Sequence, residues 1–123
     1  MLNLLFFTYK YNHRYESKRR IELRFIVSYT VNPDFVRENK ENIAVFLQDF
    51  KQLDQSLFNY AVFVKDDGVT FTHISNYKDE KIQTEVLNVP SFLDFQKKRD
   101  ASGLNNSHTV QVLNYVGSTQ KVI

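Results

Sequence analysis

The stretch Val62–Ile74, which reads VFVKDDGVTFTHI, predicts two β-strands joined by a tight turn. Apolar and β-branched residues stand on both sides of Asp66-Asp67-Gly68, and Asp-Gly between two such runs is a strong hairpin signal. The second run contains a histidine, His73. That side chain can act as a hydrogen-bond donor or general base in a pocket, since the histidine pKa lies near working pH. It can equally be a strand-edge histidine satisfied by backbone or solvent, and the hairpin loop length that decides its face stays open.

Two elements precede this hairpin. Ile21–Val31 is rich in β-branched and aromatic residues and predicts a strand. Asn32-Pro33-Asp34 then predicts a helix start, with Asn as the N-cap and Pro at the first helical position. Residues spaced by three and four follow on one helical face, and they are Val36, Asn39, Ile43, Phe46, Phe50, Leu53 and Leu57.

Two further elements follow the hairpin, which the charged segment Lys78–Lys81 ends. Pro90–Leu104 predicts a second helix with Gly103 as its C-terminal cap, and Phe92, Phe95 and either Gln96 or Arg99 share a face. Lys97-Lys98-Arg99 is most simply the solvated side and end of that helix. Thr109–Val116 predicts the last strand.

The resulting β-α-β-β-α-β order predicts a ferredoxin-like α+β fold, with an antiparallel sheet and both helices on one face. The segment Tyr60–Val64 is nevertheless apolar throughout, and the last strand has valines on one side and Leu113 and Tyr115 on the other. A strand covered on one face alternates apolar and polar residues. We therefore expect a second copy of the sheet to cover the other face, as a homodimer.

Composition narrows the functional classes. At 123 residues the chain predicts one domain, 21–118, with an N-terminal extension at 1–20 and a C-terminal tail at 119–123. Cysteine is absent, which rules out a disulfide framework or a cysteine zinc site and suits a cytoplasmic location. The apolar run Leu2–Phe7 is far shorter than the roughly 20 residues that span a bilayer, so no membrane partner is expected.

Charge is unevenly distributed along the chain. Residues 1–20 carry five basic residues and one acidic residue, which leaves eleven basic and thirteen acidic residues in the remainder. Because a phosphate-binding surface needs clustered positive charge on the folded body, nucleic acid is not an expected partner. An RNA-recognition module shares the element order, but GVTFTHIS lacks the basic-Gly-aromatic-Gly pattern of such domains.

Five segments, in their order along the sequence, resemble the antibiotic biosynthesis monooxygenase-like family, whose members are dimeric α+β barrels. The residues that carry the resemblance are Val31-Asn32-Pro33-Asp34, Val36-Arg37-Glu38-Asn39, Asp66–His73, Leu87–Gln96 and Val116-Gly117-Ser118. The resemblance implies back-to-back sheets in a dimer and a pocket between sheet and helices. Relatives include oxygenases of electron-rich polycyclic phenols that need no metal or flavin, and haem-degrading enzymes. The latter use an Asn, Trp and His set, from which this chain departs because it contains no Trp.

His73 is the candidate catalytic residue. Asn39, on an otherwise apolar helical face, either caps local structure or points into a cavity. Tyr29 and Tyr60 offer hydroxyls on apolar bodies that suit a pocket, the core or a dimer interface. Three phenylalanines complete the predicted pocket, as core residues first and ligand-stacking walls second, and they are Phe71, Phe92 and Phe95. His108, at the start of the last strand, is expected to face solvent.

Two functions therefore remain open. The first is a cofactor-independent monooxygenase that acts on a small aromatic or quinol-like substrate, with no metal and no bound cofactor. The second is a non-catalytic homodimer that binds a small apolar or aromatic ligand or has a regulatory role. The histidines show no metal-ligand spacing, and neither a Gly-x-Ser-x-Gly elbow nor a glycine-rich phosphate loop occurs.

Overall fold

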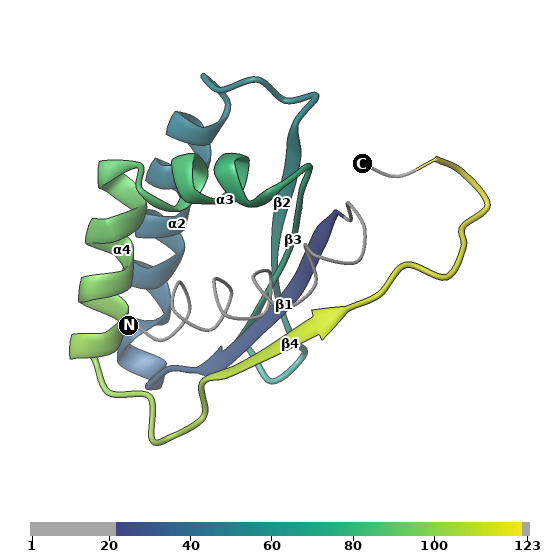
Figure 1. Ribbon diagram of the computed structural model, residues 1–123. Helices are drawn as coiled ribbons and strands as arrows, with labels where there is room; N and C mark the ends of the chain where they lie inside the picture. The colour runs from purple at the N-terminus through teal and green to yellow at the C-terminus, as the bar shows by residue number, and fades with distance from the viewer. Residues whose placement is uncertain (1–21, 122–123) are drawn as a thin grey trace.

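The computed structural model describes residues 22–121, which fold as a four-stranded antiparallel sheet with helices on one face (Figure 1). The strands are β1 (Leu23–Thr30), β2 (Phe58–Val64), β3 (Thr70–Tyr77) and β4 (Thr109–Leu113), in the sheet order β2-β3-β1-β4. This is the ferredoxin-like arrangement, so the predicted fold class is confirmed. The predicted extension at 1–20 lies outside the described residues.

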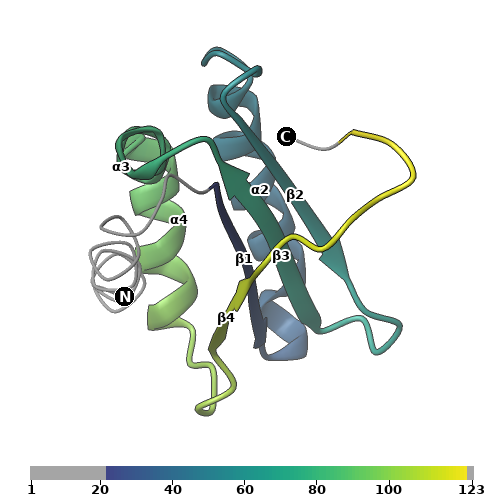
Figure 2. The same cartoon turned by 45° about the vertical axis from the view of Figure 1, so that its right-hand side comes forward.

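The helices are a short 3-10 turn η1 (Pro33–Phe35), then α2 (Val36–Phe50), α3 (Glu80–Leu87) and α4 (Pro90–Ala101). In both views α2 and α4 lie on the same side of the sheet (Figures 1 and 2). The residues that follow β4 extend away from the sheet, in yellow. No helix within residues 22–121 has the length and apolar character needed to cross a membrane.

The hairpin between β2 and β3 is closed by local chemistry. Asp67 accepts the backbone N–H groups of Val69 and Thr70 at 2.9 and 2.8 Å, and Gly68 adopts a φ of 76°. Left-handed backbone of this kind favours glycine. The resulting register places Val64 opposite Phe71 and Val62 opposite His73. The loop thereby directs His73 to the helix-covered face, which answers the question that the sequence left open.

Alternation along β1 separates the two faces of the sheet. Leu23, Phe25, Val27 and Tyr29 are buried, while the residues between them are only partly buried. On the open face, Phe63, Ile74 and Leu113 are 56%, 39% and 37% exposed. The open face therefore exposes large apolar side chains to solvent.

Several predicted boundaries differ from those observed. The first helix ends at Phe50, so Leu53 and Leu57 lie beyond it, and the side chain of Asn32 donates to the carbonyl of Ser102 rather than capping the helix. Helix α3 was not predicted, although Asp79 caps it by accepting the N–H of Ile82. Helix α4 ends at Ala101, and Gly103 follows with a φ of 87°, as its predicted cap role requires. The last strand is shorter than predicted and ends at Leu113, so that Val116 is 98% exposed.

Phe46 lies at the centre of the core between the sheet and the helices. It is fully buried, and its ring centroid lies 4.9 to 5.0 Å from those of Phe50, Phe92 and Phe95. We expect Phe46→Ala to lower the free energy of unfolding by about 3–5 kcal/mol, because it removes this contact area and leaves a cavity. Chemical denaturation measures the change. The exposed Val45 of the same helix supplies the control, since Val45→Ala should cost less than about 0.5 kcal/mol. Equal costs for the two variants would contradict the assigned core.

Candidate functional site

The imidazole of His73 lies between two tyrosine hydroxyls. Its Nε2 atom is 2.8 Å from the hydroxyl oxygen of Tyr29, and its Nδ1 atom is 2.8 Å from the hydroxyl oxygen of Tyr60. Asn39 extends the chain, since its Nδ2 donates to the Tyr29 hydroxyl at 3.1 Å. Four side chains from four elements therefore form one hydrogen-bonded chain, which we call the Asn39–Tyr60 chain.

Strand register explains why these side chains meet. His73 of β3 stands opposite Val27 of β1 on one side and Val62 of β2 on the other. Tyr29 and Tyr60 each lie two residues from these partners, on the same face and in opposite directions along β3. Diagonal neighbours in a sheet are within reach of long aromatic side chains. The two hydroxyls can thus reach the imidazole of His73, one at each ring nitrogen.

The predicted pocket residues gather around this chain. Asn39, Tyr29 and His73 are at most 2% exposed, whereas Tyr60 is partly buried. The Tyr29 ring stacks on Phe71 at 5.7 Å, and the His73 ring lies 5.5 Å from Phe95. Phe92 lies 6.0 Å from Tyr60. The structure thus brings together all seven predicted residues, while their catalytic or binding roles stay predictions.

Burial in this aromatic shell decides the protonation states. Loss of solvent, with smaller effects from Arg99 and His108, lowers the pKa of His73 to about 3. Burial also raises the pKa of Tyr29 to about 12, although the Asn39 hydrogen bond and the Arg99 charge oppose the increase. The pKa of Tyr60 is raised well above its ordinary value, again mainly by burial. At neutral pH the Asn39–Tyr60 chain therefore contains a neutral histidine and two neutral phenols.

Arg99 also belongs to this site. Of its two predicted placements, the face shared with Phe92 and Phe95 is confirmed, and the solvated side of the helix is wrong. Arg99 is 2% exposed, and its guanidinium carbon lies 5.0 Å from the ring centroid of Tyr29 and 5.3 Å from that of Phe95. Its Nε donates to Asp100 at 3.0 Å; Nη2 is also 3.0 Å from that carboxylate, but without hydrogen-bond alignment. Helical spacing from Phe92 and Phe95 was the available signal. His108 was also misplaced, since it is partly buried and burial lowers its pKa.

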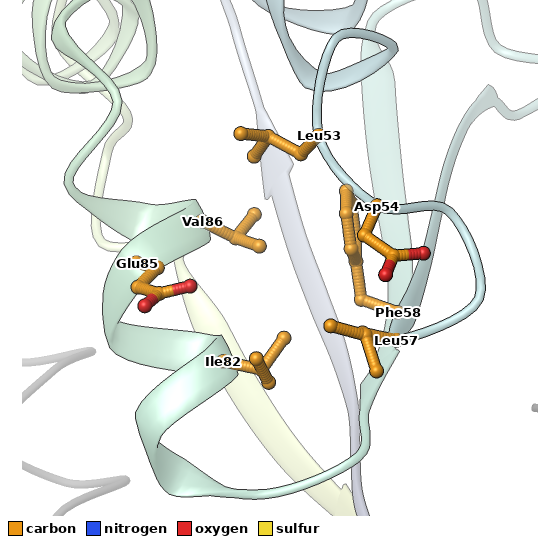
Figure 3. Close-up of a pocket in the computed structure, with 7 residues that line it drawn as sticks. All are labelled: Leu53, Asp54, Leu57, Phe58, Ile82, Glu85 and Val86. Carbon is orange, nitrogen blue, oxygen red and sulfur yellow. The ribbon is translucent and has the colours of Figure 1, made fainter.

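A separate hollow lies at the far end of the sheet, between α3 and the loop that follows α2 (Figure 3). Leu57, Phe58, Ile82 and Val86 supply apolar walls. Its volume is about 70 Å³, compared with the roughly 300–1,000 Å³ typical of ligand pockets. This hollow is too small for a polycyclic ligand. Across residues 22–121, no group of three or more metal-ligating side chains occurs.

Comparison with known proteins supports the fold. No family model matches the sequence, and no curated protein matches it. Solved structures do match. A structure described as an antibiotic biosynthesis monooxygenase is 16% identical with a TM-score of 0.66, over 77% of this chain and 99% of the other. SnoaB, a cofactor-independent oxygenase from Streptomyces nogalater, is 17% identical with a TM-score of 0.62, over 81% of this chain and 98% of the other.

A third similar structure comes from Mycobacterium tuberculosis, with 14% identity and a TM-score of 0.67 over 81% of this chain and all of the other. The chain therefore has the fold of the antibiotic biosynthesis monooxygenase structures. The resemblance stated from the sequence is confirmed at that level. At these identities the likeness concerns the fold, and chemistry must be argued from the site.

The low pKa of His73 makes stability depend on pH. As pH falls below about 6.5, His73 of the unfolded chain binds a proton. In the folded protein the buried His73 binds a proton only near its lowered pKa of about 3. The free energy of unfolding should therefore fall with decreasing pH in this window, by up to about 1.4 kcal/mol per unit from this group. Above about pH 6.5 the contribution of His73 should be flat.

His73→Gln, which cannot titrate, should remove this slope. Chemical denaturation at several pH values between about 5 and 7 measures it, before most carboxylates titrate. His108→Gln is the matched control, and it should remove only the smaller contribution of a partly buried histidine. An unchanged slope in His73→Gln would show that His73 is not held neutral by burial.

Proposed function

We propose that this chain is a cofactor-independent monooxygenase that oxidises a small aromatic, quinol-like substrate with molecular oxygen. The observation that carries the proposal is the Asn39–Tyr60 chain, a hydrogen-bonded set of side chains enclosed by aromatic rings. The fold shared with SnoaB, described as a cofactor-independent oxygenase, supports the same class. His73 holds the centre of the chain.

The chemistry requires little from the protein beyond enclosure and proton control. A phenolic anthrone or quinol that has lost a proton to solvent is an electron-rich carbanion that transfers electrons to oxygen directly. A carbon–oxygen bond forms, and the resulting peroxide anion takes a proton from the site. Loss of water then breaks the oxygen–oxygen bond and leaves a carbonyl group. One oxygen atom enters the product and the other becomes water, so that carbon is oxidised and oxygen is reduced. An aromatic enclosure protects such a carbanion from water.

A second candidate function is a homodimer that binds a small apolar ligand without reaction. The packing around His73 favours this binding protein, because the rings of Tyr29, Phe46 and Phe95 stand between the imidazole and a substrate. A ligand must then displace these rings or bind at the Tyr60 end of the chain. The two candidates differ in whether oxygen is consumed.

Oxygen uptake with the phenolic anthrone dithranol tests the first candidate. We expect the full chain to form the anthraquinone danthron with one molecule of oxygen consumed per product, faster than spontaneous oxidation. With isotope-labelled oxygen gas, mass spectrometry should find one labelled atom in the new carbonyl. His73→Ala should lower kcat by about 100-fold or more, the usual contribution of a positioned proton-transfer group.

Tyr77→Phe is the matched control for this test, because Tyr77 is equally buried but bonds outside the Asn39–Tyr60 chain. It should retain the rate. Failure to accelerate oxidation of dithranol or other quinols would contradict the oxygenase, and a rise in melting temperature with the same compounds would then support the binding protein.

We also propose that the chain is a homodimer that packs the open faces of two sheets together. Phe63, Ile74 and Leu113 are at least 37% exposed there, and Ile74 stands between Ile26 and Ala61 in the register. These residues form an apolar surface that solvent does not favour. A second copy would bury the same patch on both chains, which a two-fold axis requires.

Ile74→Glu should convert the dimer into a monomer, because each chain would bring an unpaired carboxylate into the proposed interface. Sedimentation at micromolar concentration measures the mass. Val45→Glu, on the helical side of the molecule and 57% exposed, is the control and should leave the mass unchanged. A wild-type chain that sediments as a folded monomer would contradict the dimer.

A further inference from the structure

The Asn39–Tyr60 chain has a direction. The amide nitrogen of Asn39 can only donate, and it donates to the hydroxyl oxygen of Tyr29. A phenol carries one hydrogen, and the other partner of the Tyr29 hydroxyl is Nε2 of His73, so that hydrogen points to Nε2. A neutral imidazole that accepts at Nε2 carries its own hydrogen on Nδ1. It therefore donates from Nδ1 to the hydroxyl oxygen of Tyr60.

This direction leaves the hydrogen of Tyr60 as the free end of the chain. Among residues 22–121, the Tyr60 hydroxyl forms no hydrogen bond besides the one with His73. At the opposite end, the carbonyl oxygen of Asn39 is buried and finds no hydrogen-bond partner within the described part of the chain. Tyr60 is only partly buried, so an oxygen acceptor of a ligand could reach its unpaired hydrogen and satisfy it.

We propose that Tyr60 is the residue that donates a proton to the substrate, and that Asn39, Tyr29 and His73 are positioning residues that set its direction. This inference deepens the proposed function and rests on it for the chemical step. The acceptor it requires is an oxygen atom on a planar aromatic body, such as the peroxide anion of the oxidised substrate or the carbonyl of its product.

Charge placement favours the same direction. The guanidinium of Arg99 lies over the ring of Tyr29, and the amide of Asn39 donates to its oxygen, so both offset part of the cost that burial imposes on a negative charge at this end. As Tyr60 gives its proton to the peroxide, the Nδ1 proton moves to Tyr60 and the Tyr29 proton moves to Nε2. Tyr29 becomes the phenolate and later regains its proton through Nε2 of His73, as Tyr60 takes a proton from water and passes one back to Nδ1. The imidazole stays neutral throughout, as its burial requires.

Position in the fold also selects Tyr60. It lies on β2, which among the described strands is an edge strand that pairs with β3 alone. It is partly buried, whereas the other three members of the chain are at most 2% exposed. The Tyr60 ring meets Phe50 and Phe46 nearly edge-on, at 5.2 and 5.6 Å. A flat ligand reaches the Asn39–Tyr60 chain most easily from the β2 edge of the sheet.

The tautomer of His73 tests the direction independently of any reaction. With ring nitrogens isotope-labelled, nitrogen chemical shifts should show a neutral His73 protonated on Nδ1. Asn39→Asp should reverse the tautomer, because a carboxylate only accepts hydrogen bonds. The hydroxyl of Tyr29 would then donate to the introduced carboxylate, and Nε2 of His73 would carry the hydrogen and donate to Tyr29. Asn42→Asp, on the same helix and outside the chain, is the control and should leave the tautomer unchanged. A wild-type His73 protonated on Nε2 would overturn the proposal.

The role of Tyr60 is tested by Tyr60→Phe against Tyr77→Phe. With dithranol, Tyr60→Phe should lower kcat by about 100-fold while KM changes little, as expected for a proton donor. With danthron as a probe, its affinity should fall about tenfold for the loss of one hydrogen bond. If the wild type does not oxidise dithranol, the proposed function fails, and danthron affinity alone decides the role of Tyr60. Equal affinity of wild type and Tyr60→Phe, or no binding to either, would overturn it.

Discussion

The placement of a neutral imidazole between two phenols is the interaction on which the site depends. His73 is almost fully buried, and a buried histidine keeps its place only when both ring nitrogens have partners. Tyr29 and Tyr60 supply those partners from the two strands that flank β3. A one-residue slip of either pairing would turn a tyrosine to the open face and leave a nitrogen unsatisfied. The polar chain therefore specifies the register of three strands as well as their chemistry.

The aromatic shell determines which chemistry is available. Because Phe46 and Phe95 exclude water from His73, a mechanism that charges the imidazole would cost several kcal/mol. Proton transfer along the Asn39–Tyr60 chain avoids that cost, since Nε2 of His73 gains a proton as Nδ1 loses one. Arg99 is the one buried cation beside the chain among the described residues, and it faces the ring of Tyr29. The charge that accompanies proton movement can therefore reside on that phenol.

Sequence patterns predicted the element order and the residues that gather at the site, because alternation and Asp-Gly turn chemistry act locally. The face of His73 depended on the hydrogen bonds of Asp67, which decide the loop and cannot be read from residue types. Helix α3 was missed because its cap, Asp79, lies in a charged segment with few apolar residues. Helical spacing placed Arg99 beside Phe92 and Phe95, whereas its charge favoured the solvated side of the helix, and residue type alone could not decide between them. The contacts of the Arg99 guanidinium with the Tyr29 ring and with Asp100 offset the cost of burying its charge. Both contacts arise only when the fold is complete.

Strand β2 connects the two sides of the sheet. Its inward residues include Tyr60, at the free end of the hydrogen-bonded chain, and its outward residues include Phe63, which is 56% exposed. As an edge strand it is held by hydrogen bonds on one side only, so it opens more easily than β1 or β3. A second copy packed on Phe63 would restrain β2 from outside without touching the core. Association would then limit the movement of Tyr60, so the proposed dimer and the proposed proton donor are mechanically linked through one strand.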